Sequence, residues 1–296
     1  MFDSPLSASP YEVLGTEPAA SHDELRRAFR VRMRETHPDT GGDAAEFIQV
    51  QRAWEILGTP ETRAKFDTGS SAETSWRPRE ASVGGVRLRT AAHGAAGAWR
   101  RAVYADAARE RAGNDADVYA ASFVRTAPWE LRVILADAIA EEETAAAIDD
   151  LGIGFTVWHS VAIGEDDALD HVILAPSGLY GLTSEDLGGP VRFRRGEPIG
   201  AGVGDRTPIA DLVRRIRVVA RTAGVRFGGA ILILPDDDLG EGATSLGIVR
   251  GMPVVVVRRS ALRTVLRSGV PGARTIGGNE LFDVRTRLTQ RVRTRS

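Results

Sequence analysis

The chain has 296 residues, a formal net charge of −2 and ordinary fractions of apolar and charged residues. This length allows one large domain or two smaller ones, and the near-neutral charge excludes a global field that would draw the protein to nucleic acid or anionic lipid. Cysteine is absent, which excludes disulfides, thiolate zinc sites and cysteine nucleophiles.

Neither end nor middle of the chain predicts a membrane segment. The first ten residues, MFDSPLSASP, lack a basic region followed by an apolar core, and the longest apolar runs, near AILILP and MPVVVV, are too short to span a bilayer. Because the lack of cysteine also fits a reducing compartment, we expect a cytoplasmic protein.

Residues 10–67 predict a four-helix module built around a helical hairpin. Ser21 and Glu24 form an S-x-x-E capping box, so a helix is expected from residue 22 to about residue 36. A second apolar stripe predicts another helix from about Asp43, so that the two pack antiparallel. The apolar positions are Leu25, Ala28, Phe29 and Met33 on the first helix, and Phe47, Val50, Trp54 and Leu57 on the second. Pro38 cannot continue the first helix, which places His37, Pro38 and Asp39 at the exposed tip.

The first helix of this hairpin also carries a strip of arginines. Arg26, Arg30 and Arg34 lie at i, i+4 and i+8, with Arg27 beside them, so their guanidinium groups share one exposed face. Arginines on a helix are most often solvated charge, and His37 and Asp39 have an equally ordinary reading as turn and cap residues.

The module resembles the J-domain of the DnaJ family. The resemblance runs in order through PYEVLG, ELRRAFRVRMRETHPD and FIQVQRAWEILGTPETRAKFD, and these flanking motifs make it specific where a bare His-Pro-Asp would not be. It implies that His37, Pro38 and Asp39 contact a DnaK-type (heat-shock seventy-kilodalton) chaperone and stimulate its ATP hydrolysis. It further implies that Arg26, Arg27, Arg30 and Arg34 dock on an acidic surface of that chaperone.

Residues 68–116 are predicted to be a linker that is partly helical. They are rich in Ser, Gly, Ala and Arg, with a helix expected near AWRRAVYADAARERA. The chain has no glycine/phenylalanine-rich segment, and without cysteine it lacks the zinc-binding repeats of the DnaJ family. It therefore looks like the divergent class whose C-terminal part sets location or client.

Residues 117–296 predict an α/β domain. A helix, WELRVILADAIAEEETAAAIDDLG, leads into the β-type runs FTVWHSVAI, DHVILAP, GLYGLTS and VRFRR, and the helix IADLVRRIRVVARTAG follows. The continuous apolar runs GAILILP and PVVVVRR indicate strands buried on both faces. Helices from about residues 260 and 279 close the chain.

The order helix, three strands, helix, strand resembles the core of the PD-(D/E)xK nucleases, and LDHVILAPSGLYGL looks like their nuclease-related (NERD) branch. The simpler reading is that Asp170 and His171 begin a buried strand and that residues 176–178 form a hairpin turn. The resemblance implies a Mg²⁺ site between an Asp and a Glu, with a Lys two positions after the Glu. Asp170 matches the first carboxylate, but Thr183 stands in the place of the Glu and Glu185 in that of the Lys.

These departures predict a degenerate nuclease site with no catalytic residue, metal or cofactor. The single lysine, Lys65, lies in the J-domain-like module, and arginine is a poor substitute for proton transfer. Glu142 and Glu143 with Asp170 and Glu185 stay open as a carboxylate cluster for a metal, although acids at helix and strand ends are more often solvated caps.

The sequence thus predicts a J-domain co-chaperone, not itself an enzyme, with an inactive NERD-like domain that binds a client or sets location. One alternative is an active nuclease coupled to a chaperone. The other is a nucleic-acid-binding protein in which VRFRR, VRRIRVVAR and RTRLTQRVRTRS follow phosphates.

Overall fold

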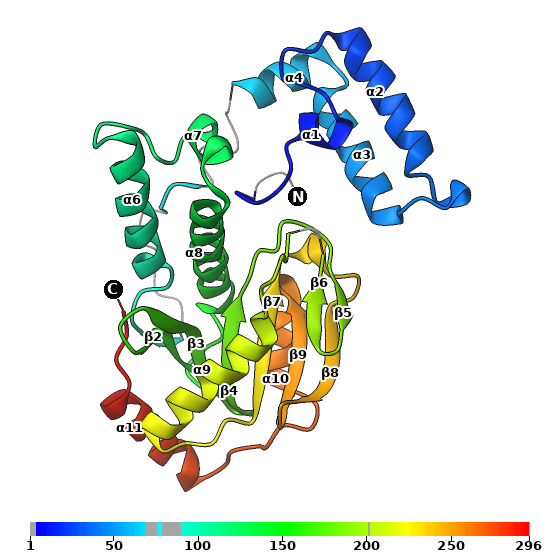
Figure 1. Ribbon diagram of the computed structural model, residues 1–296. Helices are drawn as coiled ribbons and strands as arrows, with labels where there is room; N and C mark the ends of the chain where they lie inside the picture. The colour runs from blue at the N-terminus through cyan, green and yellow to red at the C-terminus, as the bar shows by residue number, and fades with distance from the viewer. Residues whose placement is uncertain (1–3, 69–75, 79–89, 201, 296) are drawn as a thin grey trace. The chain divides into compact units, whose positions relative to one another are not determined.

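The computed structural model describes residues 4–68, 76–78, 90–200 and 202–295. It divides into a helical unit, residues 1–79 and 117–127, and an α/β unit, residues 80–116 and 128–296 (Figure 1). This division differs from the predicted boundaries, because residues 90–116 of the predicted linker contribute a strand and a helix to the α/β unit. Residues 69–75 and 79–89 of that predicted linker lie outside the described residues.

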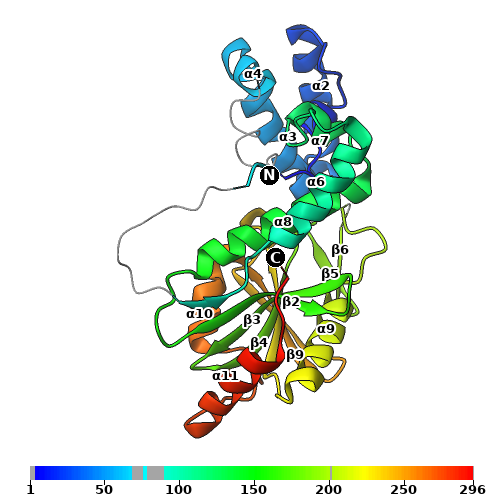
Figure 2. The same ribbon diagram turned by 90° about the vertical axis from the view of Figure 1, so that its left-hand side faces the viewer.

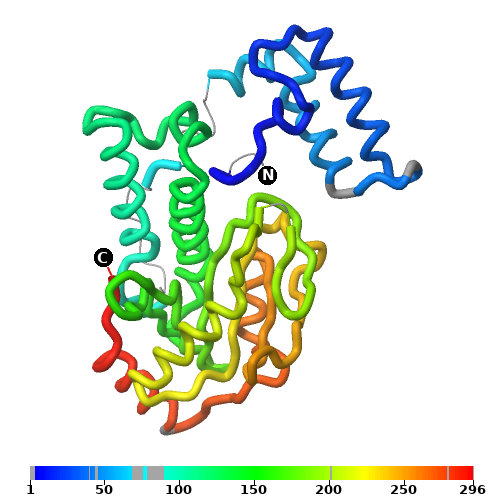
Figure 3. The backbone as a smooth tube through the Cα atoms, in the orientation of Figure 1, coloured from blue at the N-terminus to red at the C-terminus, as the bar shows by residue number. Residues whose placement is uncertain are grey.

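The helical unit contains α1 (Pro10–Leu14), α2 (His22–Glu35), α3 (Ala44–Leu57) and α4 (Pro60–Asp67). Both capping boxes that begin the unit are formed, Ser9 with Glu12 and Ser21 with Glu24, so the starts of α1 and α2 follow directly from local sequence. The predicted antiparallel pairing of α2 and α3 is confirmed (Figure 3). Their shared core contains the buried side chains of Tyr11, Leu14, Leu25, Val50, Ala53 and Leu57.

Helix α4 contacts a segment from far along the chain. Helix α7 (Ala121–Thr126) places the guanidinium of Arg125 over the ring of Phe66, 4.7 Å from its centroid. Lys65, the single lysine, is exposed in the last turn of α4. Residues 117–127 therefore belong to the helical unit, where the sequence predicted the start of the α/β domain.

The α/β unit is built on a seven-stranded mixed sheet in the order β1-β2-β3-β4-β7-β9-β8. Its first strands are β1 (Ala91–His93), β2 (Thr156–Ile163), β3 (Asp167–Ala175) and β4 (Gly178–Ser184). The remaining strands are β7 (Gly229–Leu234), β8 (Ala243–Val249) and β9 (Met252–Arg258). The strands β2, β3 and β4 form an antiparallel meander, and β4, β7 and β9 run parallel at the centre.

Helices cover both faces of this sheet (Figure 2). Helices α9 (Pro208–Ala223) and α11 (Asn279–Arg291) pack on one face, and α8 (Trp129–Ile148) and α10 (Leu262–Ser268) pack on the other. The strands β7 and β9 send alternate side chains into both cores, which explains why GAILILP and PVVVVRR are continuously apolar. Gly181 of β4 is required by packing, because a Cβ there would lie 2.3 Å from Ile216 of α9.

Helix α6 (Ala98–Ala112) lies along α8 within the α/β unit and confirms the helix predicted in the linker. The predicted strand in VRFRR also exists, as β5 (Arg192–Arg194), but it pairs with β6 (Glu197–Ile199) in a separate two-stranded sheet. No helix among the described residues is long and apolar enough to cross a membrane.

Candidate functional site

The tripeptide His37, Pro38 and Asp39 lies at the tip of the α2–α3 hairpin, as predicted. His37 is extended (φ −64°, ψ 129°), and residues Pro38–Thr40 form a single 3-10 turn, η1. The extended conformation follows from Pro38, whose ring disfavours the α region for the preceding residue. The side chain of Asp39 is 89% exposed and that of His37 is 40% exposed.

Local contacts fix the orientation of the His37 ring. Its Nδ1 accepts a hydrogen bond from the backbone N–H of Asp39 (3.2 Å), and the ring makes a T-shaped contact with the ring of Phe47 on α3, with 5.0 Å between centroids. Two glycines then close the turn for different reasons. Gly41 adopts φ 85°, whereas a Cβ on Gly42 would lie 2.2 Å from the backbone of Thr36. The tip therefore presents a histidine and a carboxylate in a defined arrangement.

The predicted arginine strip is exposed along α2. Arg26, Arg27, Arg30 and Arg34 all have exposed side chains. Arg32, on another face of the helix, donates from Nε to the carbonyl of Val13 (3.3 Å). The structure thus places four guanidinium groups on the helix that leads directly into the tripeptide.

Comparison with known proteins finds relatives of the segment that contains α1 to α4. The family model described as the DnaJ domain matches residues 9–67. Residues 9–67 are a DnaJ domain. The chain is 44% identical over 66 residues to Chaperone protein DnaJ 1 of Cutibacterium acnes, which covers 22% of this chain and 17% of that protein.

Two further relatives match the same part of the chain. Chaperone protein DnaJ of Gloeothece citriformis is 43% identical over 68 residues, which covers 22% of this chain and 18% of that protein. Chaperone protein dnaJ A6 of Oryza sativa subsp. japonica is 46% identical over 57 residues, which covers 19% of this chain and 14% of that protein. The chain therefore spans less than a fifth of the length of these curated relatives, and the likeness concerns the DnaJ domain alone.

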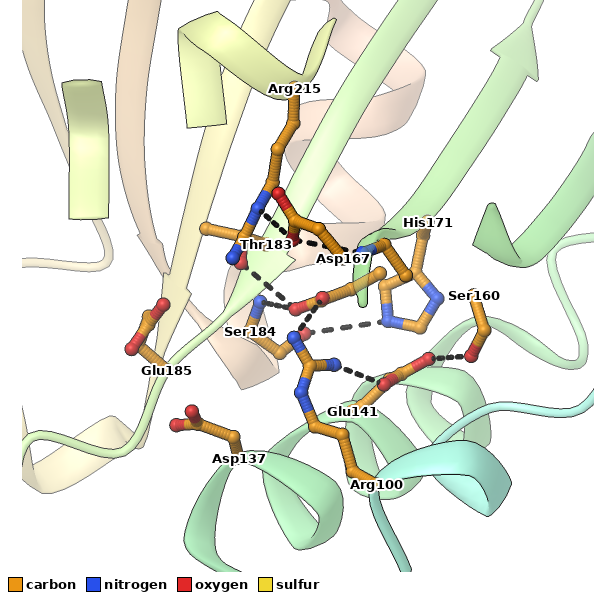
Figure 4. A network of polar contacts seen from close by, with 12 residues as sticks. Arg100, Asp137, Glu141, Ser160, Asp167, His171, Thr183, Ser184, Glu185 and Arg215 are labelled. Carbon is orange, nitrogen blue, oxygen red and sulfur yellow. Dashed lines mark hydrogen bonds and ion pairs between the residues drawn. The ribbon is translucent and has the colours of Figure 1, made fainter. Parts of the chain in front are cut away.

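Outside the DnaJ domain, a buried ionic network lies where the sequence predicted a degenerate site (Figure 4). Asp170 of β3 is fully buried, and its Oδ2 accepts hydrogen bonds from the Thr183 hydroxyl (2.9 Å) and the Ser184 backbone N–H (2.8 Å) on β4. Its Oδ1 accepts from Nη2 of Arg100 (2.8 Å). Asp170 and Thr183 are therefore brought together, and both belong to one saturated set of hydrogen bonds.

Arg100 joins this carboxylate to a second one. Its Nη1 donates to Oε2 of Glu141 on α8 (2.5 Å), and the other oxygen of Glu141 accepts from the Ser160 hydroxyl. Ser160 adopts φ 47°, a left-handed conformation that residues other than glycine rarely adopt. Burial opposes the positive charge on Arg100, but Asp170 and Glu141 outweigh it and raise the pKa of the guanidinium.

The third predicted residue, Glu185, has a different set of neighbours. Its Oε2 accepts from Nη1 of Arg206 (3.1 Å), and its carboxylate lies beside that of Asp137 (Figure 4). Burial raises the pKa of both carboxyl groups, and each is close enough to further buried acids for repulsion to add to the effect. The predicted reversal of charge at Glu185 is thus balanced locally by Arg206.

The carboxylate cluster that the sequence left open, Glu142, Glu143, Asp170 and Glu185, does not assemble. Glu142 pairs with Arg101 (2.8 Å) and Glu143 pairs with Arg259 (2.5 Å), so each carboxylate faces its own guanidinium. Among the described residues, no group of three His, Cys, Asp or Glu side chains could hold a metal ion.

A histidine pair completes the polar interior. Nδ1 of His159 lies 2.9 Å from Nδ1 of His171, a hydrogen bond that requires one ring to carry its proton on Nδ1 and the other on Nε2. Burial lowers the pKa of His159 to about 4 and that of His171 to about 3. Both imidazoles are consequently neutral near pH 7.

The sequence alone did not predict that Arg100, Asp137, Glu141 and Arg206 belong to this network. For the two acids a signal existed, because Asp137, Glu141 and Thr144 are spaced i, i+4 and i+7 on α8, in register with the buried Ile148. Acids on a core-facing stripe are rarely buried without a partner. That spacing favours Glu141 over its neighbours Glu142 and Glu143 as the acid that joins Asp170.

Proposed function

We propose that this chain is a co-chaperone whose DnaJ domain binds a DnaK-type chaperone and stimulates its ATP hydrolysis. The observation that carries the proposal is the oriented tripeptide at the end of an exposed arginine face, within the segment that matches the DnaJ domain. His37, Pro38 and Asp39 would make the contact that stimulates hydrolysis. Arg26, Arg27, Arg30 and Arg34 would orient α2 on an acidic surface of the partner.

Reversal of charge on α2 tests the orienting role. We expect the triple substitution of Arg26, Arg27 and Arg30 to Glu to weaken binding to a DnaK-type chaperone by at least about tenfold at low salt, because the steering charge changes sign. The loss should shrink as ionic strength rises, since screening weakens attraction and repulsion alike. Affinity is measured by titration of the labelled chaperone at several salt concentrations.

The matched control reverses three exposed arginines of the α/β unit, Arg109, Arg111 and Arg267, and so makes the same change in net charge. Two results would show that the α2 face has no specific role. One is an equal loss of affinity in both triple variants, and the other is an affinity that changes neither with the α2 substitutions nor with salt concentration.

We further infer that the α/β unit is a catalytically inactive relative of the NERD-type nuclease core, retained to bind a client protein or to set location. The order α8, β2, β3, β4, α9, β7 supports this proposal, together with the position of Asp170 on the second strand and of Thr183 and Glu185 on and after the third. A threonine removes an anionic metal ligand, and Glu185 replaces a cation beside an anionic substrate.

The full-length chain is therefore expected not to cleave DNA with Mg²⁺ or Mn²⁺. The assay follows supercoiled and linear substrates on gels, with Asp170→Ala as the control that identifies contamination. Metal-dependent cleavage that disappears in Asp170→Ala would overturn the inference of inactivity.

The nucleic-acid alternative has less support from the contacts of the arginine-rich elements. Arg287 and Arg291 of α11 donate to the carbonyls of Gly224 and Ala223 at the end of α9. Arg295 stacks on Trp99 and donates to the carbonyl of Gly164. These guanidinium groups make hydrogen bonds and a stacking contact within the protein, which favours a structural role for RTRLTQRVRTRS over phosphate binding.

A further inference from the structure

The strand β8 leaves one long edge of the seven-stranded sheet open. It is the last strand in the sheet order, and among the described strands it pairs only with β9 (Figure 1). The strand at the opposite edge, β1, has only three residues, whereas β8 has seven. An edge strand presents unpaired backbone N–H and C=O groups, which are a template for pairing with another strand. The β8 edge is therefore the longer of the two edges at which this sheet could be extended.

The sequence of β8 lacks the side chains that usually prevent such pairing. Its seven residues, ATSLGIV, include no charged residue and no proline, although 26% of the chain is charged. Leu246 and Val249 pack against the core that includes α9, so the alternation of side chains directs Ala243 and Ile248 to the other face of the sheet. Ile248 is 66% exposed there. An uncharged edge with an exposed branched apolar side chain favours another strand as its neighbour.

A backbone contact shows which way the first residues of β8 face. The N–H of Arg258 on β9 donates to the carbonyl of Gly242, so the backbone groups of Gly242 point toward β9. Successive residues of an antiparallel strand direct these groups to opposite sides. The N–H and C=O of the next residue, Ala243, therefore point away from the sheet.

The other end of β8 presents its backbone in the same way. Val249 and Met252 pair at the two-residue turn to β9, so Val249 faces β9 and the preceding residue, Ile248, faces outward. The bulge between Ser245 and Gly247 adds one residue to β8, which is why two positions five residues apart both face outward. Ala243 and Ile248 are thus both available to a neighbouring strand.

A two-fold axis at β8 would satisfy both positions at once. When β8 pairs antiparallel with β8 of a second copy, Ala243 can lie opposite Ile248 of that copy, and the same pair recurs on the other side of the axis. Glu241 precedes Ala243 by two residues and Arg250 follows Ile248 by two, so this register also places each Glu241 opposite an Arg250. Both side chains are exposed, and neither makes an ion pair with another described residue. The edge is complementary to itself in hydrogen bonding and in charge.

We propose that the protein forms a two-fold symmetric dimer in which β8 pairs antiparallel with β8 of a second copy, with Ala243 opposite Ile248 and Glu241 opposite Arg250. The two seven-stranded sheets become continuous across this interface, and each dimer carries two DnaJ domains. Because one pair of strands buries little surface, the dimer should be weak and should exchange with the monomer. The inference concerns assembly and goes beyond the proposed function.

Reversal of charge at the ends of β8 tests this register. Glu241→Arg and Arg250→Glu are each expected to raise the dissociation constant of the dimer about tenfold at low salt, because both ion pairs across the axis become repulsive. The double variant should restore the wild-type constant. Glu241 and Arg250 are nine positions apart in the chain, about 30 Å along a strand, so the restored pairs can form only between two copies. Sedimentation velocity of the full-length chain over a concentration series measures the constant.

Glu165→Arg and Arg226→Glu are the matched controls. They make the same changes in charge at exposed positions of the α/β unit outside β8, and they should leave the dissociation constant unchanged. A third variant, Ala243→Pro, removes an outward N–H at the first residue of the strand, where proline is tolerated. It should weaken the dimer at every salt concentration while the circular dichroism stays that of the wild type.

Three results would overturn the proposal. The first is a wild-type chain that stays monomeric throughout the concentration series. The second is a dimer with the same dissociation constant in the wild type, the single reversals and Ala243→Pro, since its interface would lie elsewhere. The third is a double reversal that dimerises no more tightly than the single reversals. All three results concern assembly, so they are independent of the ATPase and cleavage tests of the proposed function.

Discussion

His37→Gln is expected to abolish stimulation of ATP hydrolysis by a DnaK-type chaperone while leaving the fold intact. The side chain is 40% exposed and sits at a turn, where it contacts the Asp39 backbone and meets the Phe47 ring in a T-shaped arrangement. Surface substitutions of this kind change stability by only about 0.5 kcal/mol. The loss should therefore concern the interaction with the partner, and a single-turnover ATPase assay measures it directly.

The control for this variant is His93→Gln, the same chemical change on the exposed strand β1 of the α/β unit. The His93→Gln variant should stimulate ATP hydrolysis by the chaperone to the same extent as the wild type. Equal stimulation by wild type and His37→Gln would contradict the proposed role of the tripeptide, whereas equal loss in both histidine variants would point to an effect outside it.

Asp170→Asn is expected to destabilise the α/β unit by about 1–3 kcal/mol, because Arg100 keeps its ion pair with Glu141 but a buried hydrogen-bond donor loses its charged acceptor. The amide would also replace an oxygen that accepts from Arg100, Thr183 or the Ser184 backbone. The direction of the change is informative. Carboxylates held for catalysis are commonly strained, and neutralising one often raises stability at the expense of activity.

Hydrogen exchange of peptides from β3 and β4 measures this effect separately from the DnaJ domain, which should exchange as in the wild type. Asp150→Asn is the control, since Asp150 pairs with Arg263 at the surface, where the two side chains are 39% and 40% exposed. That pair should contribute less than about 1 kcal/mol. An Asp170→Asn protein as stable as the wild type, or more stable, would contradict a structural role for the network.

The sequence predicted those helices and strands that are determined by neighbouring residues along the chain. The predicted capping box at Ser21 begins α2, and the predicted apolar runs of β7 and β9 follow from burial on both faces. The strand β8 was missed because it lies at the sheet edge, where no position is fully buried and a bulge near Gly247 interrupts the alternation of exposed and half-buried residues. The strand β1 was missed because three exposed residues, Ala91–His93, carry no such pattern at all.

The ionic network could be predicted only in part, because its members are distant in sequence. Asp170 and Thr183 followed from the family resemblance, but Arg100 lies 41 residues from Glu141 and 70 residues from Asp170. It also belongs to a segment whose composition indicated a linker. Nothing in a single sequence links a guanidinium on one helix to carboxylates on two later elements, whereas the fold makes that link explicit.

The position of Lys65 offers a way to read the folding of the DnaJ domain alone. A lysine-specific endoprotease has one cleavable bond in this chain, between Lys65 and Phe66, and that bond lies within α4. Phe66 is held by the Tyr11 ring, 6.1 Å away between centroids, and by Arg125 of α7. A protease needs an extended substrate, so the rate of this single cleavage depends on how often α4 unfolds locally. Unfolding of the sheet in the α/β unit does not expose this bond. Cleavage after Lys65 therefore measures local unfolding of the DnaJ domain in the native sequence, without an engineered cleavage site.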